Sequence, residues 1–371
     1  TVFLTPDEHV PFFTGTYFPP VSAYGRPAFK EVLTAVSKAW QTREAEIRQQ
    51  NNAILDAFSR SSSTTGSCVL TDAPIKKVTQ LLETSFEPGR GGFSQAPKFP
   101  HPDMLNQCLV SWYDNTEPEL KNSCIHMADI TGRFMALGGV NDHVGGGFCR
   151  YSTDAEWMIP HFEKMLYDNG PLMGFYTDLF LITGNELFKQ AVESTAQWTQ
   201  REMQSSQGGY YSAQDADSEG VEGKFYVWKK DDIKQLLTAD EYKLVARYFS
   251  LDRAANFEGH WHLHCDAQRY PEGMNAEQRL LWKSAREKLF NVRKQRVAPG
   301  TDDKILTAWN ALMIKGMVKA GVVFGEDSWI DSAERSLKFI LAALWKEGRL
   351  LAVHREGVSH LNAYLDDYAY L

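Results

Sequence analysis

The chain opens with two short apolar stretches that have the residue types of β-strands. Residues 1–5 are largely apolar or β-branched, and residues 11–18 follow a Pro-Asp turn and end at two prolines, a pattern typical of paired strands. Residues 26–58 are expected to form a helix, because apolar side chains recur there at helical spacing. They include Phe29, Leu33, Val36, Trp40 and Ile47. A lone hairpin is barely stable in water, so we expect the rest of its sheet to lie outside this sequence.

A linker rich in Ser and Thr, residues 59–70, separates this 1–58 segment from a mainly helical region, residues 71–371. That region repeatedly places a Gly-Gly-aromatic loop between helical stretches, and glycine supplies the positive φ that such loops need. The loops are 91–93, 146–148 and 208–210. Helices are expected at 72–86, 102–114, 119–137, 160–183, 186–206, 303–324 and 328–346, with another starting near 361. Repeated helical hairpins predict an (α/α) toroid, incomplete at its C-terminus.

Residues 210–300 break the rhythm of helical hairpins. They contain two strand-like stretches, 224–228 and 261–264, and short charged helical segments. We interpret this part as an insertion folded over one rim of the toroid. Long loops on a rigid scaffold are where binding and chemistry concentrate.

The overall composition narrows the classes of partner. With 43% hydrophobic residues the chain can build a core, and no run approaches the roughly 18 apolar residues of a membrane span. The formal net charge of −8 argues against nonspecific binding to nucleic acid or to anionic membranes. Five cysteines are scattered without a C-x-x-C pair, which predicts reduced thiols in a cytoplasmic compartment. They are Cys68, Cys108, Cys124, Cys149 and Cys265.

The segment from Pro160 gathers ionisable side chains in apolar surroundings. On the expected helix His161, Lys164 and Asp168 share one face, and Glu163 lies one turn before Tyr167. That face would offer a base, a cation and an acid. The alternative interpretation is a solvated charged face whose apolar neighbours are buried.

An acidic loop, residues 212–220, supplies two further candidates. Asp215 and Asp217 are two residues apart, so their like charges can raise the pKa of one while the other stays ionised. Acids at alternate positions also imitate a calcium loop, but Tyr226 stands where that loop needs a bidentate acid. We therefore favour acid and base roles for the two aspartates.

Another acidic pair precedes the helix expected at 303–324. Asp302 has the residue type of a helix N-cap, which leaves Asp303 as the better functional candidate. Nearby in sequence, His260, His262 and His264 alternate and on a strand would resemble a metal comb. A surface strand is the alternative, since no carboxylate or cysteine nearby completes a ligand set. We expect neither a metal nor another cofactor.

Several longer segments together resemble the spermatogenesis-associated protein 20 family, whose members carry a thioredoxin domain. These segments are 93–100 (FSQAPKFP), 141–148 (NDHVGGGF), 150–154 (RYSTD), 161–168 (HFEKMLYD), 215–220 (DADSEG) and 308–310 (AWN). The resemblance covers essentially the whole chain. Two places depart from the family pattern: residues 297–301, before Asp302, and the positions of His260 and His262.

The resemblance implies a mainly α fold in two parts. Residues 1–58 would be the last two strands and final helix of a thioredoxin-like α/β domain. Residues 71–371 would be an incomplete six-hairpin (α/α)₆ barrel, similar to those of N-acylglucosamine 2-epimerases and several glycosidases. The sequence is then a fragment that lacks the redox-bearing part of the first domain and the closure of the barrel.

The same resemblance points to sugar chemistry at the barrel mouth. The expected catalytic residues are His161, Asp168, Asp215, Asp217 and Asp303. The expected substrate-binding residues are His143, Arg150, Tyr151, Trp157, Glu163, Lys164, Tyr167 and Trp309. An epimerase or isomerase would use histidines as acid and base, whereas a hydrolase would pair carboxylates. In the alternative, the thioredoxin-like domain acts on a protein partner and the barrel only binds.

Overall fold

The computed structural model describes residues 1–22, 25–62, 71–114, 117–267, 270 and 273–371. The chain forms two compact units, Thr1–Thr71 and Asp72–Leu371. Residues 63–70 of the expected linker, and Cys68 with them, lie outside the described residues. None of the helices in the described ranges combines the length and apolar character that crossing a membrane requires.

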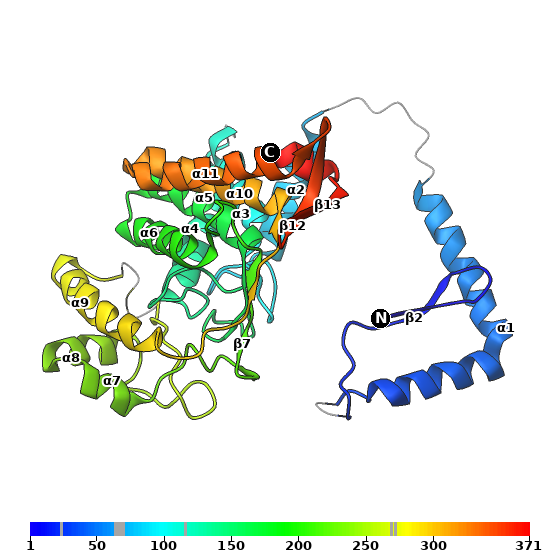
Figure 1. Cartoon of the computed structure of the whole chain (residues 1–371), viewed down its shortest axis with the longest axis horizontal. Helices are drawn as coiled ribbons and strands as arrows, with labels where there is room; N and C mark the ends of the chain where they lie inside the picture. The colour runs from blue at the N-terminus through cyan, green and yellow to red at the C-terminus, as the bar shows by residue number, and fades with distance from the viewer. Residues whose placement is uncertain (23–24, 63–70, 115–116, 268–269, 271–272) are drawn as a thin grey trace. The chain divides into compact units, whose positions relative to one another are not determined.

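The first unit consists of a β-hairpin and one long helix, as its apolar pattern predicts. β1 (Val2–Leu4) pairs antiparallel with β2 (Pro11–Thr14), and α1 (Phe29–Ser62) follows. α1 is kinked at Arg43, whose φ of −135° and ψ of 29° are not helical, and Figure 1 shows the bend. Val32 is buried, but Phe58 is 64% exposed. The hairpin and helix therefore provide only a small core.

The second unit is built largely from antiparallel helix pairs, which confirms the mainly α fold class. Its main helices are α2 (Ala73–Ser85), α3 (Pro102–Asp114), α4 (Pro118–Leu137), α5 (Leu166–Thr183), α6 (Glu186–Trp198), α10 (Thr307–Phe324) and α11 (Asp327–Ala343). A π-helical turn, Thr199–Met203, continues α6. Figure 1 shows α5, α10 and α11 side by side, and α10 packs against both of the others.

Two of these helices begin later than the hydrophobic periodicity indicates. α5 begins at Leu166 rather than at 160, and α10 begins at Thr307 rather than at 303. The residues before each helix are short strands. β5 (Lys164–Met165) pairs with β6 (Ala213–Gln214), and β10 (Ile305–Leu306) pairs with β12 (Arg349–Arg355). Backbone groups that bond across a sheet cannot also close a helical turn, so the prediction of the helix starts was wrong.

Two of the Gly-Gly-aromatic loops are held by the same device. On α5, Asn169 accepts the backbone N–H of Phe148 at 2.7 Å and donates to its carbonyl oxygen at 3.0 Å. On α10, Asn310 does the same to Tyr210, at 2.7 and 3.0 Å. Each asparagine lies one turn inside its helix and also donates to the carbonyl oxygen four residues earlier. The repeat in the sequence is therefore also a repeat of three-dimensional contacts.

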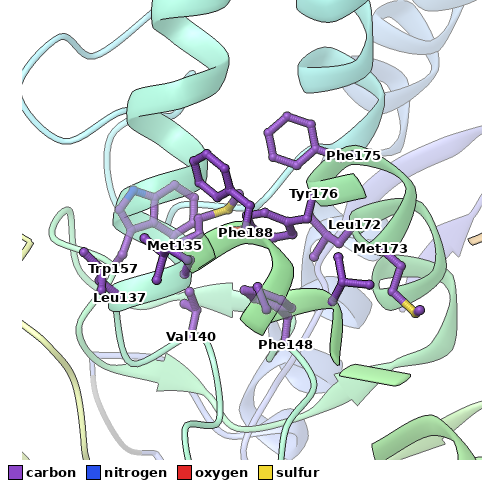
Figure 2. Packing of buried hydrophobic residues seen from close by; sticks show 14 of the residues in the cluster. Met135, Leu137, Val140, Phe148, Trp157, Leu172, Met173, Phe175, Tyr176 and Phe188 are labelled. Carbon is purple, nitrogen blue, oxygen red and sulfur yellow. The ribbon is translucent and has the colours of Figure 1, made fainter. Parts of the chain in front are cut away.

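Close packing of α5 on α10 forms the centre of the unit. A Cβ on Gly170 would lie 2.7 Å from the backbone of Met313, and a Cβ on Gly316 would overlap the carbonyl oxygen of Gly170. Around this contact a large apolar core is buried. Figure 2 shows part of it, in which the ring of Phe148 stacks on Tyr176 with centroids 5.2 Å apart. Glycine at the contact allows the two helix backbones to approach.

The described part of residues 210–300 contains three helices and short strands. The helices α7 (Lys230–Leu236), α8 (Ala239–Tyr248) and α9 (Ala276–Arg293) pack on one another and form a group of their own in Figure 1. The strands β7 (Asp217–Ser218) and β8 (Val221–Glu222) make a hairpin, while β6 joins β5 and β9 (Thr301–Asp302).

The strands expected at 224–228 and 261–264 are not formed, and only one bridge, Trp228 to Trp261, joins the two stretches. A turn begins at Gly223, whose carbonyl oxygen accepts the N–H of Tyr226 at 2.9 Å. The carbonyl oxygens of Phe225 and Val227 bind Arg296 at 2.8 and 2.7 Å. Carbonyls bound by a guanidinium do not pair with a neighbouring strand, so this prediction was wrong.

The chain continues beyond α11 with a small sheet and a short helix. β11 (Trp345–Lys346) and β13 (Val358–Asn362) both pair with β12. α12 (Leu365–Tyr370) follows. Asp367 of α12 accepts the backbone N–H of Ala308 at 2.8 Å, so a distant residue caps the first turn of α10.

Candidate active site

A short pair of strands places the first site residues. β3 (Tyr151–Ser152) and β4 (Pro160–His161) are antiparallel, with Tyr151 opposite His161. The two rings stack with centroids 5.0 Å apart at 21°. His161 therefore lies on a strand, Lys164 on another and Asp168 in the first turn of α5. The expected shared helix face was wrong, because the chain is extended before Leu166.

His161 forms a hydrogen-bonded pair with a residue that the sequence analysis missed. Its Nδ1 lies 2.7 Å from Oε1 of Glu222, on β8. Glu222 raises the pKa of His161 chiefly through this hydrogen bond, against the opposing effect of burial. Glu222 lies two residues beyond the acidic segment 215–220. This closeness to an acidic segment was the only feature of the sequence that indicated Glu222, and it does not show that Glu222 contacts His161.

On the other side of His161, three residues form a polar chain toward α5. Arg150 donates to Glu163 at 3.0 Å and to the hydroxyl of Tyr167 at 3.2 Å. Nε2 of His161 lies 3.7 Å from Glu163. Tyr167 then meets Trp309 of α10 edge-on, with ring centroids 4.7 Å apart. The structure thus brings together residues that the sequence holds in four separate segments.

Asp168 is the buried acid of this group. Its side chain is 8% exposed, and its Oδ2 has no hydrogen-bond partner among the described residues. Burial raises the pKa of Asp168 to about 7, helped by Glu163 and opposed by Arg150. A carboxyl with such a pKa can both give and take a proton near neutral pH.

A large cavity opens beside Asp168. Its volume is about 1390 Å³, and Tyr167, Asp168 and Trp309 are among its lining residues. It runs between α3, α5 and α10, so it lies wholly within the second unit. An acid, a phenol and an indole therefore face the same space.

Lys164, expected to bind substrate, is placed inside the fold. Its side chain is 1% exposed, and its Nζ binds Asp142 at 2.8 Å and the carbonyl oxygen of Gly146 at 2.7 Å. Arg293 binds the same carboxylate, and these charges hold the pKa of Asp142 well below its ordinary value in spite of burial. The contacts of Lys164 are those of a structural ion pair.

His143 and Trp157 are also used within the fold. Nε2 of His143 donates to the carbonyl oxygens of Leu137 and Gly138 at 3.1 and 2.9 Å, and burial lowers the pKa of His143 to about 4. Trp157 is fully buried and donates to the carbonyl oxygen of Arg90 at 3.1 Å. Both lie around the end of α4 rather than at the cavity.

Three expected catalytic acids lie outside the cavity lining. Asp215 and Asp217 are exposed at the base of the β7–β8 hairpin, where Oδ1 of Asp215 accepts the N–H of Asp217 at 3.2 Å. Asp303 forms an ion pair with Arg355 of β12 at 2.8 Å. Asp302 lies in β9 and does not cap α10.

The alternating histidines do not form a comb. Nε2 of buried His262 donates to the carbonyl oxygen of Gly139 at 2.7 Å, and Nδ1 of His264 lies 3.0 Å from the side-chain amide of Asn256. Nδ1 of His260 lies near the carbonyl oxygen of Glu258, at 3.0 Å. The three histidines lie on an irregular segment rather than on a surface strand. Across the described ranges, no cluster of three His, Cys, Asp or Glu could hold a metal ion.

The first unit matches a known family model. The model is named Thioredox_DsbH, is described as "Protein of unknown function, DUF255", and matches residues 1–59. This match supports the thioredoxin-like assignment of the hairpin and α1.

The whole chain is similar to curated proteins of animals. It is 32% identical to spermatogenesis-associated protein 20 of Homo sapiens, covering 100% of this chain and 52% of the human protein. It is 34% identical to the protein of the same name from Rattus norvegicus, with the same coverage. An uncharacterized protein of Caenorhabditis elegans is 33% identical, with 56% of it covered. The chain thus spans about half the length of the curated relatives it matches.

Solved structures show a more distant likeness to this chain. A sugar epimerase from a ruminal bacterium is 14% identical with a TM-score of 0.31, covering 80% of this chain and 93% of that one. A D-mannose isomerase is 10% identical with a TM-score of 0.32, covering 81% and 94%. Along its whole length, then, the chain is similar to spermatogenesis-associated protein 20, which confirms the resemblance that its motifs indicate, and residues 1–59 match a thioredoxin-type family model.

Proposed function

We propose that the site around Asp168 catalyses proton transfer on a small sugar, as an epimerase or isomerase does. The observation that carries this proposal is the buried carboxyl of Asp168, which lines a cavity and has a pKa of about 7. General acid–base catalysis is most efficient when the pKa of the catalytic group lies near the working pH. Near neutral pH an aspartate with its ordinary pKa is almost completely ionised, so it is a weak base and rarely has a proton to donate.

His161 supplies a second proton-transfer group. Inverting a carbon next to a carbonyl needs one group to remove a proton and another to return it. His161 is not one of the residues lining the cavity. Its Nδ1 is bonded to Glu222, so Nε2, which lies 3.7 Å from Glu163, is the nitrogen left to exchange a proton. Arg150 connects the two parts of the site, since it contacts Glu163 and Tyr167 and acts on the charge of Asp168.

The lining of the cavity suits a neutral polyhydroxylated ligand. Trp309 and Tyr167 provide aromatic surface, on which the apolar face of a sugar ring can pack. Asp168 and Asp366 also line the cavity, together with Lys315, whereas Asp178 and Lys319 of the lining are paired with each other. Hydroxyl groups can both donate to carboxylates and accept from ammonium groups, so a sugar fits this mixed surface.

A glycoside hydrolase is the second candidate, because Asp168 has a carboxylate neighbour. Glu163 raises the pKa of Asp168, and a protonated acid beside an ionised carboxylate is the pair that hydrolases use. In that mechanism Asp168 would protonate the leaving oxygen. In the other alternative, the thioredoxin-like domain carries the activity and the second unit only binds.

The test is exchange of carbon-bound hydrogen in D₂O. The chain is incubated with D-mannose, D-glucose or cellobiose, and NMR follows loss of the proton at C2. We expect exchange by the parent chain and its loss in Asp168→Asn. Asp178→Asn is the matched control, since Asp178 lines the same cavity but is ion-paired with Lys319. Cleavage of cellobiose without exchange would favour the hydrolase, and equal rates in both variants would contradict a catalytic role for Asp168.

A further inference from the structure

We propose that Glu222 is a positioning residue for His161, a carboxylate carried by the β7–β8 hairpin that fixes the imidazole with Nδ1–H toward the hairpin and Nε2 on the side of Glu163. This inference rests on the proposed function. It assigns a role to Glu222, which the sequence analysis did not single out.

The contacts at Glu222 determine which ring nitrogen carries the proton. Oε1 of Glu222 lies 2.7 Å from Nδ1 of His161 and 3.4 Å from the backbone N–H of Phe162. A carboxylate can only accept hydrogen bonds, so Nδ1 must be the donor. In the neutral imidazole Nε2 then holds the lone pair, which is the form a general base needs.

The hairpin that carries Glu222 is held firmly against the site. Gly223, directly after Glu222, packs on Phe162, where a Cβ would lie 2.5 Å from the ring. Its φ of +73° is one that glycine adopts without strain. Ser218 of β7 donates to the carbonyl oxygen of Val297 at 2.6 Å. Contacts at Ser218 on β7 and at Gly223, directly after β8, therefore keep the carboxylate of Glu222 within reach of the ring.

Charged and titratable groups from several elements face His161. Glu222 is on β8, Glu163 lies 3.7 Å from Nε2, and the ring of Tyr151 stacks on the imidazole. Arg150 is the nearby cation and opposes protonation of His161. Glu222 contributes the largest effect on the pKa of His161. Removal of its charge should therefore give a measurable change in that pKa in spite of the other groups.

The experiment compares Glu222→Gln with Glu219→Gln in the full chain. A glutamine at 222 can still accept from Nδ1–H through its amide oxygen, so only the charge is lost. Glu219 lies on the same hairpin and binds Lys224, so its variant makes the same charge change away from His161. NMR of the histidine rings, without sugar, gives the pKa of His161 and the signal of its Nδ1 proton. His161→Gln identifies these signals.

We expect the pKa of His161 to fall by about one unit in Glu222→Gln and to stay unchanged in Glu219→Gln. Exchange at C2 of the sugar that the parent chain turns over should fall about tenfold in kcat, with KM little changed, and its pH profile should move with the pKa of His161. An unchanged pKa and Nδ1 signal in Glu222→Gln overturns the inference. The inference is also overturned if Glu222→Gln exchanges the C2 hydrogen at the parent rate although the pKa of His161 has shifted.

The two proposals fail in different ways. If the parent chain exchanges hydrogen with none of the three sugars, the proposed function is refuted, and the catalytic role of Glu222 falls with it. The ring titration is measured without a ligand, so it still shows whether Glu222 orients and charges His161. If the pKa of His161 is the same in Glu222→Gln as in the parent chain, and the parent chain shows full exchange at C2, only the role of Glu222 is refuted.

Discussion

Arg293 binds both carboxylate oxygens of Asp142, at 2.7 and 2.8 Å, although the two residues are 151 positions apart in the sequence. All three charged groups of this cluster, Asp142, Arg293 and Lys164, are almost completely buried. Asp142 also accepts the backbone N–H groups of Val144 and Gly145. The bond therefore ties α9 to the glycine loop that follows α4.

We expect Asp142→Asn to lower the free energy of unfolding by about 3–5 kcal/mol, because it leaves two buried cations without their counter-charge. Chemical denaturation of the parent and the variant measures the difference. Glu334→Gln is the control, since its pair with Lys338 is exposed and is worth at most about 1 kcal/mol. A loss of similar size in both variants would show that burial of the Asp142 cluster adds nothing.

Asp168→Asn should stabilise the chain at alkaline pH, although it abolishes exchange of the hydrogen at C2 of the sugar. The pKa of Asp168 is about 7 in the folded chain against an ordinary 3.8, so the folded state holds its proton more tightly than the unfolded state. The free energy of unfolding therefore falls as pH rises from about 4 to about 7, by up to roughly 4 kcal/mol.

Thermal unfolding at pH 4.5 and pH 8 checks the effect of Asp168→Asn. The gain in Tm should be small at pH 4.5 and largest at pH 8, whereas Asp178→Asn should show no such gain. A variant that loses stability at pH 8 would mean that the buried carboxylate is compensated by contacts other than those seen here.

Gly170→Ala and Gly174→Ala should have opposite effects, although both lie in α5. A Cβ at Gly170 would meet the backbone of Met313 at 2.7 Å, whereas a Cβ at Gly174 would meet nothing within 4 Å. We expect Gly170→Ala to lower stability by about 1–3 kcal/mol, because α10 must move. Gly174→Ala should raise stability by up to about 1 kcal/mol, since alanine favours the helix. Equal effects in denaturant titrations would show that α5 and α10 are not in close contact.

Acid should destabilise the chain below pH 6.5 because two histidines are buried in their neutral form. Burial lowers the pKa of His143 and of His262 to about 4, from an ordinary 6.5. Their stabilising effect is complete above pH 6.5 and is lost as pH falls through about 4, at up to roughly 3 kcal/mol for each.

His143→Gln tests this acid sensitivity, since its amide can still donate to the carbonyl oxygens of Leu137 and Gly138. Melting temperatures between pH 7 and pH 4 should fall less steeply for this variant than for the parent. The exposed His360 on β13 is the control, and His360→Gln should leave the slope unchanged. A parent-like slope in His143→Gln would rule out His143 as a source of the acid sensitivity.

Most of the secondary structure was predictable from local pattern. The bounds of α3 were predicted without error, and those of α2 and α4 to within one residue, because their apolar positions follow one helical period. The hairpin and α1 of the first unit were predicted in the same way. The starts of α5 and α10 were missed, since a strand of two residues has no period of its own to detect.

The candidate site was predicted in part. Of the residues singled out, Tyr167, Asp168 and Trp309 line one cavity. Arg150 reaches Tyr167 through a hydrogen bond, and His161 lies beside Glu163. The sequence also singled out Lys164, His143 and Trp157, whose contacts in the structure are internal to the fold. A charged or aromatic residue in a motif has the same letter whether it supports the fold or faces a ligand, so the motif alone could not separate the two groups.

The sequence by itself determined the helical pattern, the repeated glycine loops and the relationship to spermatogenesis-associated protein 20, because each of these resides in residues close together along the chain. The tertiary structure alone decided that Glu222 meets His161 and that Arg293 meets Asp142. It also decided the pKa of Asp168, which depends on the removal of water and on charges brought near by folding. The electrostatic environment of a group depends on its burial and on its distance from other charges. Both are set by folding and cannot be read from the order of the residues.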